Sequence, residues 1–289
     1  MSEERLGELP LVSIIIITYN SQKYVLETLD SAKAQTYPNI ELIVTDDNST
    51  DNTVEVCKQW MVENKDRFVR TEIITTEKNT GIAPNCNRGL RSSNGVWIKF
   101  FAGDDILLPN CIADFIEYIH QTPDCNVLFG RMKMLKNGII SELPSQNNIY
   151  ALSPNKLYKR LLRGPVIYAP AAFYSGKALD SVGGFDEKYP SIEDRLMQLV
   201  LLEKGYKFHY IDTPIAIYRV HESNISGVQL NNKGKKRVSR IYYDCWKRML
   251  LNEILPRQIK EMLFVYALHV LYSVFINGPI VPIKSNISS

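Results

Sequence analysis

Residues 96–105 read Val-Trp-Ile-Lys-Phe-Phe-Ala-Gly-Asp-Asp, an apolar and aromatic run of strand length that ends in a glycine and two carboxylates. Continuous apolar runs are typical of strands buried on both faces, and open α/β sheets bind ligands outside the carboxyl ends of their strands. We therefore expect Asp104 and Asp105 to stand at the rim of a sheet. Two neighbouring carboxylates suit a hard divalent cation such as Mg²⁺ or Mn²⁺. The alternative is a solvated Gly-Asp-Asp turn without chemistry.

The segments before this run alternate between strand and helix patterns. Residues 11–17 and 40–44 are rich in β-branched residues, and each is followed by a polar loop and then by apolar residues at helical spacing. A third, weaker unit begins at residues 73–74. Alternating strands and helices with short connections predict a parallel sheet with right-handed crossovers.

Beyond residue 125 the pattern predicts a mixed α+β region. A strand is expected at 127–129, and Lys136-Asn137-Gly138 between apolar pairs indicates a hairpin. Helices are expected to begin at Ser153 and at Glu193. A last strand is expected at 215–219.

Composition is that of an ordinary globular protein of 289 residues, with 45% hydrophobic residues and a net charge of +3. The five cysteines are odd in number and show no paired spacing, which argues against a disulfide framework and a zinc site and for a reducing compartment. Residues 1–5 lack the features of a signal peptide. We expect a cytoplasmic protein.

The C-terminal part has a different character. Residues 231–260 hold nine Lys or Arg against two acids, and residues 262–283 hold no Asp, Glu, Lys or Arg. A buried tail helix and an interfacial helix beside a basic patch both fit this pattern, whereas the breaks at Gly278-Pro279 and Pro282 argue against a transmembrane span. The charges lack the interleaved aromatic residues of a nucleic-acid site, so no nucleic-acid partner is expected.

Seven segments follow one another along the chain in this order: VSIIIITYN, ELIVTDDNSTDNT, NTGIAPNCNRG, the strand ending in GDD, GGFDEKY, IEDRL and YRVHES. Together, over about residues 11–225, they resemble the family 2 glycosyltransferases, inverting enzymes of the GT-A fold that use nucleotide sugars. The resemblance implies an α/β, Rossmann-like and mostly parallel sheet flanked by helices. It also implies a domain at 1–225, with a nucleotide-binding half at 11–125 and a small mixed acceptor half at 126–225. Residues 226–289 would form a basic, helical extension.

The resemblance also assigns roles to residues. Asp194 would be the general base, and Asp105 and His221 would ligate Mn²⁺ or Mg²⁺. Asp47 would accept the imide N–H of uracil, which favours a UDP-linked donor, while Asp46 orients the loop. The residues expected to contact substrate are Thr18, Tyr19, Asn20, Asp46, Asp47, Asn87, Asp104, Glu193 and Arg219.

The implied reaction moves a sugar from a nucleotide diphosphate sugar to a hydroxyl of a glycan acceptor, with inversion, in cell-surface polysaccharide synthesis. A lipid-linked acceptor and a peripheral membrane contact through residues 231–283 are further expectations.

Two residues depart from the family pattern. Ala102 replaces an aspartate found two residues before the pair in many relatives, and Cys86 replaces an arginine. Both departures favour the alternative of a nucleotide-sugar or glycan-binding module with impaired catalysis. Nucleotidyl transfer, a third hypothesis, leaves Asp194 and the Gly-Gly-Phe-Asp turn unexplained and lacks a glycine- and lysine-rich loop after the first strand.

Overall fold

A computed structural model describes residues 9–163, 166–189 and 192–221, together with isolated positions beyond residue 221. By its internal contacts the chain divides into two compact units, Met1–His221 and Glu222–Ser289. The division lies close to the boundary predicted at residue 225. The predicted helical tail and membrane contact at 231–283 fall almost wholly outside the described residues.

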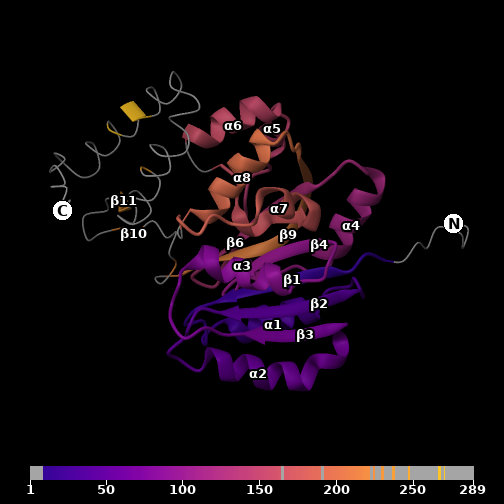
Figure 1. Ribbon diagram of the computed structural model, residues 1–289, viewed down its shortest axis with the longest axis vertical. Helices are drawn as coiled ribbons and strands as arrows, with labels where there is room; N and C mark the ends of the chain where they lie inside the picture. Colours follow the sequence, from indigo (N-terminus) through magenta and orange to yellow (C-terminus); the bar gives the residue numbers. More distant parts are fainter. Residues whose placement is uncertain are drawn as a thin grey trace, which may run out of the picture. The chain divides into compact units, whose positions relative to one another are not determined.

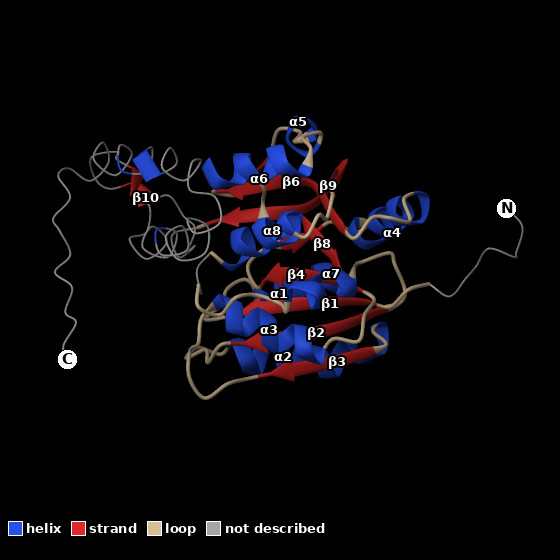
Figure 2. Cartoon of the chain, turned by 45° about the horizontal axis from the view of Figure 1, so that its top comes forward, coloured by secondary structure: helices blue, strands red, loops and turns tan. Residues whose placement is uncertain are grey.

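The first unit is built on a sheet of nine described strands in the order β3-β2-β1-β4-β8-β6-β9-β5, with β7 paired to β6. Figure 2 shows β3, β2, β1 and β4 in this order, with β8, β6 and β9 beyond β4. The strand bounds are β1 Val12–Thr18, β2 Ile40–Asp46, β3 Arg70–Ile74, β4 Trp97–Ala102, β5 Ile106–Leu107, β6 Val127–Lys136, β7 Ile139–Glu142, β8 Ala172–Ser175 and β9 Phe208–Val220.

Strands β1 to β4 form the parallel half of the sheet. Ile14, Ile15 and Ile16 are fully buried in β1, and burying each isoleucine side chain contributes about 2 kcal/mol. These β-branched residues account for the strand, because they pack well on a pleated surface covered on both faces. Helices α1 (Val25–Lys33), α2 (Thr53–Asn64) and α3 (Ile82–Ser92) connect the four strands (Figure 1).

Strands β5 to β9 form a mixed half. β8 is antiparallel to both β4 and β6, whereas β9 runs parallel to β6. The predicted hairpin joins β6 to β7, with Asn137 and Gly138 at φ +52° and +78°. The remaining helices are α4 Cys111–Gln121, α5 Asn147–Tyr150, α6 Pro154–Arg163, α7 Gly176–Val182 and α8 Glu193–Glu203, with 3₁₀ turns η2 at Lys65–Arg67 and η3 at Ala169–Ala171.

The predicted α/β class is confirmed, with parallel pairing throughout β1 to β4 and again between β6 and β9. In the second unit, β10 (Gln229–Leu230) and β11 (Lys236–Arg237) form a two-stranded antiparallel sheet. Within the described part of the chain, no helix has the length and apolar character needed to cross a bilayer. Four cysteines, Cys57, Cys86, Cys111 and Cys125, are buried and free.

Candidate active site

The carboxyl ends of β1, β2 and β4 meet at one edge of the sheet. Thr18 pairs with Asp46 in the register of β1 and β2, and Ile17 pairs with Ala102 of β4. Three loops therefore begin side by side, where open α/β sheets bind their ligands. A Cβ atom on Gly103 would lie 2.8 Å from Cγ2 of Thr18, so the close approach of the third loop requires glycine.

Asp46 ends β2 and is buried beneath the loop that follows. Its carboxylate accepts hydrogen bonds from the Thr18 hydroxyl at 2.8 Å and from the backbone N–H of Ser49 at 2.7 Å. These are the contacts of a residue that shapes the loop from below.

Asp47 ties two loops together. Its carboxylate accepts hydrogen bonds from the backbone N–H groups of Thr80 and Gly81, from the Thr80 hydroxyl, and from the Arg88 guanidinium at 2.7 Å. Burial alone would raise the pKa of Asp47, but these hydrogen bonds outweigh burial and hold the pKa below its usual range. A carboxylate has about four lone-pair positions, so a base imide N–H reaches Asp47 only by sharing or replacing a donor.

The loop after β1 presents an aromatic side chain. Asn20 adopts φ +51°, its amide oxygen accepts the backbone N–H of Thr50 at 2.8 Å, and its own N–H donates to the Ser49 hydroxyl at 2.7 Å. Beside it, Tyr19 is 48% exposed, so its ring can receive a planar base. Asn20 thus fixes the loop on which Tyr19 is displayed.

A polar cluster joins the turn after β4 to the end of β9 and the start of α1. The Asp104 carboxylate lies 2.8 Å from Nε2 of His221, and Nε of Arg219 donates to the backbone carbonyl of Asp104 at 2.8 Å. The Tyr24 ring packs against His221 and the Arg219 guanidinium, and Glu27 forms an ion pair with Arg219. Protein contacts therefore hold both Arg219 and His221 beside Asp104.

The expectation that both aspartates stand open at the rim is wrong for Asp105, which is 1% exposed. Its Oδ1 atom accepts the backbone N–H of Arg219 at 2.8 Å and so fastens β9 to β4. Burial, and then the charge of Asp104, raises the pKa of Asp105 well above its usual range. Asp104, whose side chain is 23% exposed, is the more accessible of the two carboxylates. The metal role predicted for Asp105 stays a prediction.

The Asp104 and His221 pair fits a hard divalent cation. No group of three or more His, Cys, Asp or Glu able to hold a metal occurs among the residues that the structure describes. Mg²⁺ and Mn²⁺ sites commonly use one or two protein ligands, with waters and substrate phosphates completing the shell. The oxygen of Asp104 and the imidazole nitrogen of His221 are suitable ligands, and the buried Oδ2 atom of Asp105 nearby has no hydrogen-bond partner in the described structure.

A second acidic pair opens α8. Glu193 and Asp194 form its first turn and retain partial exposure, while the Oε2 atom of Glu193 is buried with no described hydrogen-bond partner. Burial raises the pKa of Asp194, opposed in part by the N–H and charge of Arg195. Burial and the charge of Asp194 raise the pKa of Glu193 well above its usual range. A carboxylate with a raised pKa is suited to take a proton near neutral pH.

Cys86 of α3 adjoins this acidic pair. Burial, and then the charges of Glu193 and Asp194, raises the pKa of its thiol well above the usual value. The arginine expected from the family pattern would place a cation beside the pair, and cysteine does not.

Asn87 was predicted to contact substrate, and the structure uses it differently. Its amide nitrogen donates to the carbonyl of Phe185 at 2.8 Å and to the Glu187 carboxylate at 2.9 Å, while its oxygen accepts the N–H of Phe185 at 2.8 Å. Because these hydrogen bonds occupy its amide group, Asn87 holds the turn before α8 in place and does not bind a ligand.

The sequence interpretation missed the residues that support the site. Arg88 braces Asp47, and Tyr24 and Glu27 hold the side chains at the end of β9. Each acts on a partner far away in the sequence. The one local signal was the spacing of Asn85 and Arg88, which are three residues apart and so lie on one face of the helix.

Comparison with known proteins identifies the family and the fold. Residues 13–181 match the family described as Glycosyl transferase family 2. The glucosyltransferase WfaP of Escherichia coli, named as acting from UDP-Glc on α-D-GlcNAc-diphosphoundecaprenol, is 30% identical over 218 residues, which cover 75% of this chain and 80% of WfaP. An uncharacterised glycosyltransferase of Rickettsia felis is 26% identical over 88% of this chain, and the match spans only 40% of that protein.

Two solved structures share the fold. TarS of S. aureus in complex with UDP matches 92% of this chain and 72% of its own with a TM-score of 0.64 and 20% identity. The mannosyltransferase PcManGT of Pyrobaculum calidifontis, with GDP-Man and Mn²⁺, matches 94% of this chain and 76% of its own with a TM-score of 0.58 and 18% identity. The predicted GT-A architecture is confirmed, and the chain belongs to the family 2 glycosyltransferases.

Proposed function

We propose that this glycosyltransferase moves a sugar from a UDP-linked donor to a hydroxyl group of a glycan acceptor, with inversion and with the help of a divalent metal. The observation that carries the proposal is the pairing of Asp104 with His221, 2.8 Å apart, at the carboxyl edge of the parallel strands. TarS bound to UDP and WfaP, named for UDP-Glc, support a uridine donor.

The donor would lie across the edge formed by β1, β2 and β4. Tyr19 offers its exposed ring to the base. Asp47, which bonds Arg88, can accept a hydrogen bond from the base if one of its existing hydrogen bonds is shared or replaced. Asp104 and His221 would hold Mn²⁺ or Mg²⁺, and the bound ion would supply positive charge to the diphosphate. Arg219 adds a fixed positive charge beside Asp104, where negative charge develops on the leaving group.

Asp194 would act as the general base. It takes the proton from the acceptor hydroxyl as the oxygen forms a bond to the anomeric carbon. The bond from that carbon to the diphosphate oxygen breaks on the opposite face, so the configuration inverts and UDP leaves. Glu193, whose Oε2 atom is buried with no described hydrogen-bond partner, is the better candidate to hold an acceptor hydroxyl.

The relatives and the sequence support a proposal for the wider setting of the reaction. WfaP is named for a diphosphoundecaprenol-linked acceptor, which supports a lipid-linked acceptor here and a role in cell-surface polysaccharide synthesis. The basic stretch within residues 231–260 supports a cytoplasmic protein that touches the membrane surface from that side.

Three single substitutions test these roles. Asp194→Asn should lower kcat by about 10² to 10⁴-fold and leave UDP affinity unchanged, since it removes only the base. Asp104→Asn should weaken binding of UDP in the presence of Mn²⁺, measured by calorimetry, and abolish transfer. Asp105→Asn should lower the melting temperature and spare Mn²⁺-dependent UDP binding in the folded protein.

Asp66→Asn is the matched control, because Asp66 is an exposed acid at η2 outside the site. Full transfer by Asp194→Asn or Asp104→Asn would refute the mechanism. UDP binding by the unaltered chain without hydrolysis or transfer for any nucleotide sugar would favour the noncatalytic module.

A further inference from the structure

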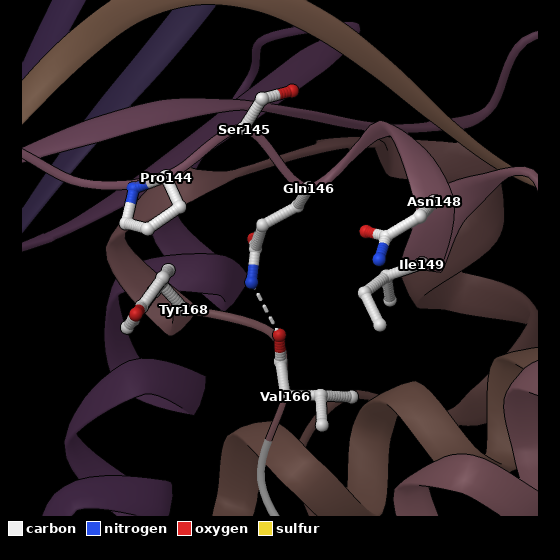
Figure 3. A pocket seen from close by; sticks show the side chains of 7 residues that line it. All are labelled: Pro144, Ser145, Gln146, Asn148, Ile149, Val166 and Tyr168. Carbon is white, nitrogen blue, oxygen red and sulfur yellow. Dashed lines mark hydrogen bonds between the residues drawn. The ribbon is translucent and has the colours of Figure 1, made fainter.

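A surface pocket of about 280 Å³ lies in the mixed half of the sheet, outside the cluster described above. Its walls come from two chain segments, residues 144–149 at the start of α5 and residues 166–168 just before η3. Figure 3 shows Gln146, Asn148, Ile149 and Tyr168 around the same hollow.

The register of the sheet places one wall toward the edge that carries Asp104. β8 is antiparallel to β4, with Ser175 opposite Trp97 and Tyr174 opposite Ile98. Residues that precede β8 therefore run back toward the carboxyl end of β4. The buried Lys99 of β4 donates hydrogen bonds to the carbonyls of Pro170 and Ala172 and so fixes this segment to β4.

The second wall, residues 144–149, lies at the same level along the strands as the segment before β8. The N–H of Gln146 donates to the Tyr210 hydroxyl at 3.2 Å, and Tyr210 of β9 pairs with Phe129 of β6, which pairs with Ala172 of β8. Two strand spacings separate β9 from β8, which is about 10 Å and comparable with the length of a disaccharide. Asp194 lies near β8, because burial and then the charge of Asp194 raise the pKa of Tyr174 in that strand. The wall that Gln146 anchors to β9 is thus two strands from the strand beside Asp194, at the distance of a neighbouring sugar.

The chemistry of the walls suits a neutral polyol. None of the described lining residues carries a charge, so these walls themselves offer a phosphate no ion pair. The side-chain amide nitrogen of Gln146 is fixed on the carbonyl of Val166, which leaves its oxygen to accept from a ligand hydroxyl. Tyr168 is 40% exposed and offers an aromatic face with a polar tip, and Asn148 adds a second amide.

We propose that this pocket is a second acceptor subsite, which binds the sugar next to the one that carries the reacting hydroxyl. The inference rests on the proposed glycosyl transfer and adds to it a preference for acceptors of at least two sugars. Tyr168 packs on the sugar ring, and the amides of Gln146 and Asn148 bond its hydroxyl groups.

The experiment compares acceptor length. KM is measured for a panel of p-nitrophenyl disaccharides (chitobiose, cellobiose, maltose, lactose and mannobiose) and for the matching monosaccharides. For the unaltered protein, we expect KM to be about tenfold lower for the best disaccharide than for its monosaccharide. Tyr168→Ala should remove this difference and leave the monosaccharide KM, kcat and UDP affinity unchanged, whereas Tyr168→Phe should preserve it.

Gln59→Ala, which alters an exposed amide on α2, is the control for surface substitution, and thermal unfolding confirms that each variant is folded. If Tyr168→Ala keeps the length preference, or raises KM equally for both acceptors, the subsite is refuted while transfer through Asp194 stands. If no transfer occurs at all, saturation-transfer NMR with the same disaccharides in the presence of UDP decides. Binding that is lost in Tyr168→Ala supports the subsite, and binding to none of the panel overturns it.

Discussion

Lys99 is a fully buried lysine in the middle of β4. Its ammonium group donates to the carbonyls of Pro170 and Ala172 and lies 5.7 Å from the centre of the Phe101 ring. Burial lowers its pKa to about 8, because the charged form loses its water. The lysine connects the strand that ends at the site with the wall of the pocket.

Replacing this lysine should change how stability depends on pH. In the folded chain Lys99 loses its proton near pH 8, but in the unfolded chain near 10.5, so the unfolded state binds more protons between these values. The unaltered protein should therefore gain stability as pH rises through this window, by about 2 kcal/mol between pH 8 and 9.5. Lys99→Met lacks this gain.

Urea unfolding at pH 7, 8.5 and 9.5 measures the difference between the two proteins. The exposed Lys58→Met is the control and should show no pH-dependent difference. A free-energy difference for Lys99→Met that stays constant across this range would contradict the assignment.

The two neighbouring aspartates show what a sequence tells about single residues. The pattern of residues 96–105 predicted a strand at 96–101 that ends at a polar edge, and β4 spans Trp97–Ala102. It could not tell which carboxylate faces solvent, because that depends on the N–H of Arg219, which arrives 114 positions later. Asp105 was therefore expected at the open rim, where Asp104 is the more exposed of the two.

Helix α3 links the site's two acidic regions. Asn85 donates to the carbonyl of Thr45 at 3.1 Å, and Arg88 bonds the Asp47 carboxylate. On another face, Asn87 holds Phe185 in the turn between α7 and α8. The helix thus sets the positions of both the nucleotide-binding loop and the turn that leads to Asp194.

The turn offers a matched pair of glycines. Gly183 and Gly184 have φ of +77° and +80°, but a Cβ on Gly183 meets nothing within 4 Å, whereas one on Gly184 would lie 2.7 Å from Oδ1 of Asn87. Gly183→Ala should cost about 1 kcal/mol through backbone strain alone. Gly184→Ala should cost about 2 to 3 kcal/mol, because it also displaces the Asn87 amide.

Urea denaturation of both variants in the unaltered and Asn87→Ala backgrounds tests this contact. In the Asn87→Ala background the obstacle is gone, so the cost of Gly184→Ala should fall to that of Gly183→Ala. Equal costs for the two glycines in the unaltered background would show that α3 does not secure the turn.

Elements with a strong local pattern were predicted, and those defined by distant partners were not. The β-branched runs of β1 and β2 and the Asn-Gly hairpin were confirmed. β9 was predicted only at 215–219 but spans Phe208–Val220, because Asp212-Thr213-Pro214 breaks the apolar pattern. The strand continues through that point, where its register with Arg131 of β6 shifts and accommodates the proline.

The candidate site residues Thr18 to His221 all lie in the first compact unit, Met1–His221, which also holds the nine-stranded sheet. A core of this size is large enough to fold without further chain. The basic stretch within residues 231–260 belongs to the second unit. This division assigns nucleotide binding to one unit and the proposed membrane contact to the other.

A chain of residues 1–225 should therefore separate the two properties. We expect it to unfold cooperatively and to gain melting temperature with UDP and Mn²⁺ as the full chain does, since the ligands bind only the native state. It should not sediment with vesicles of phosphatidylcholine and phosphatidylglycerol, whereas the full chain should, less so as NaCl is raised, because salt screens the attraction. Neutral vesicles are the control. A shortened chain without cooperative unfolding would place the boundary elsewhere, and one that still sediments would remove the membrane contact from residues 231–283.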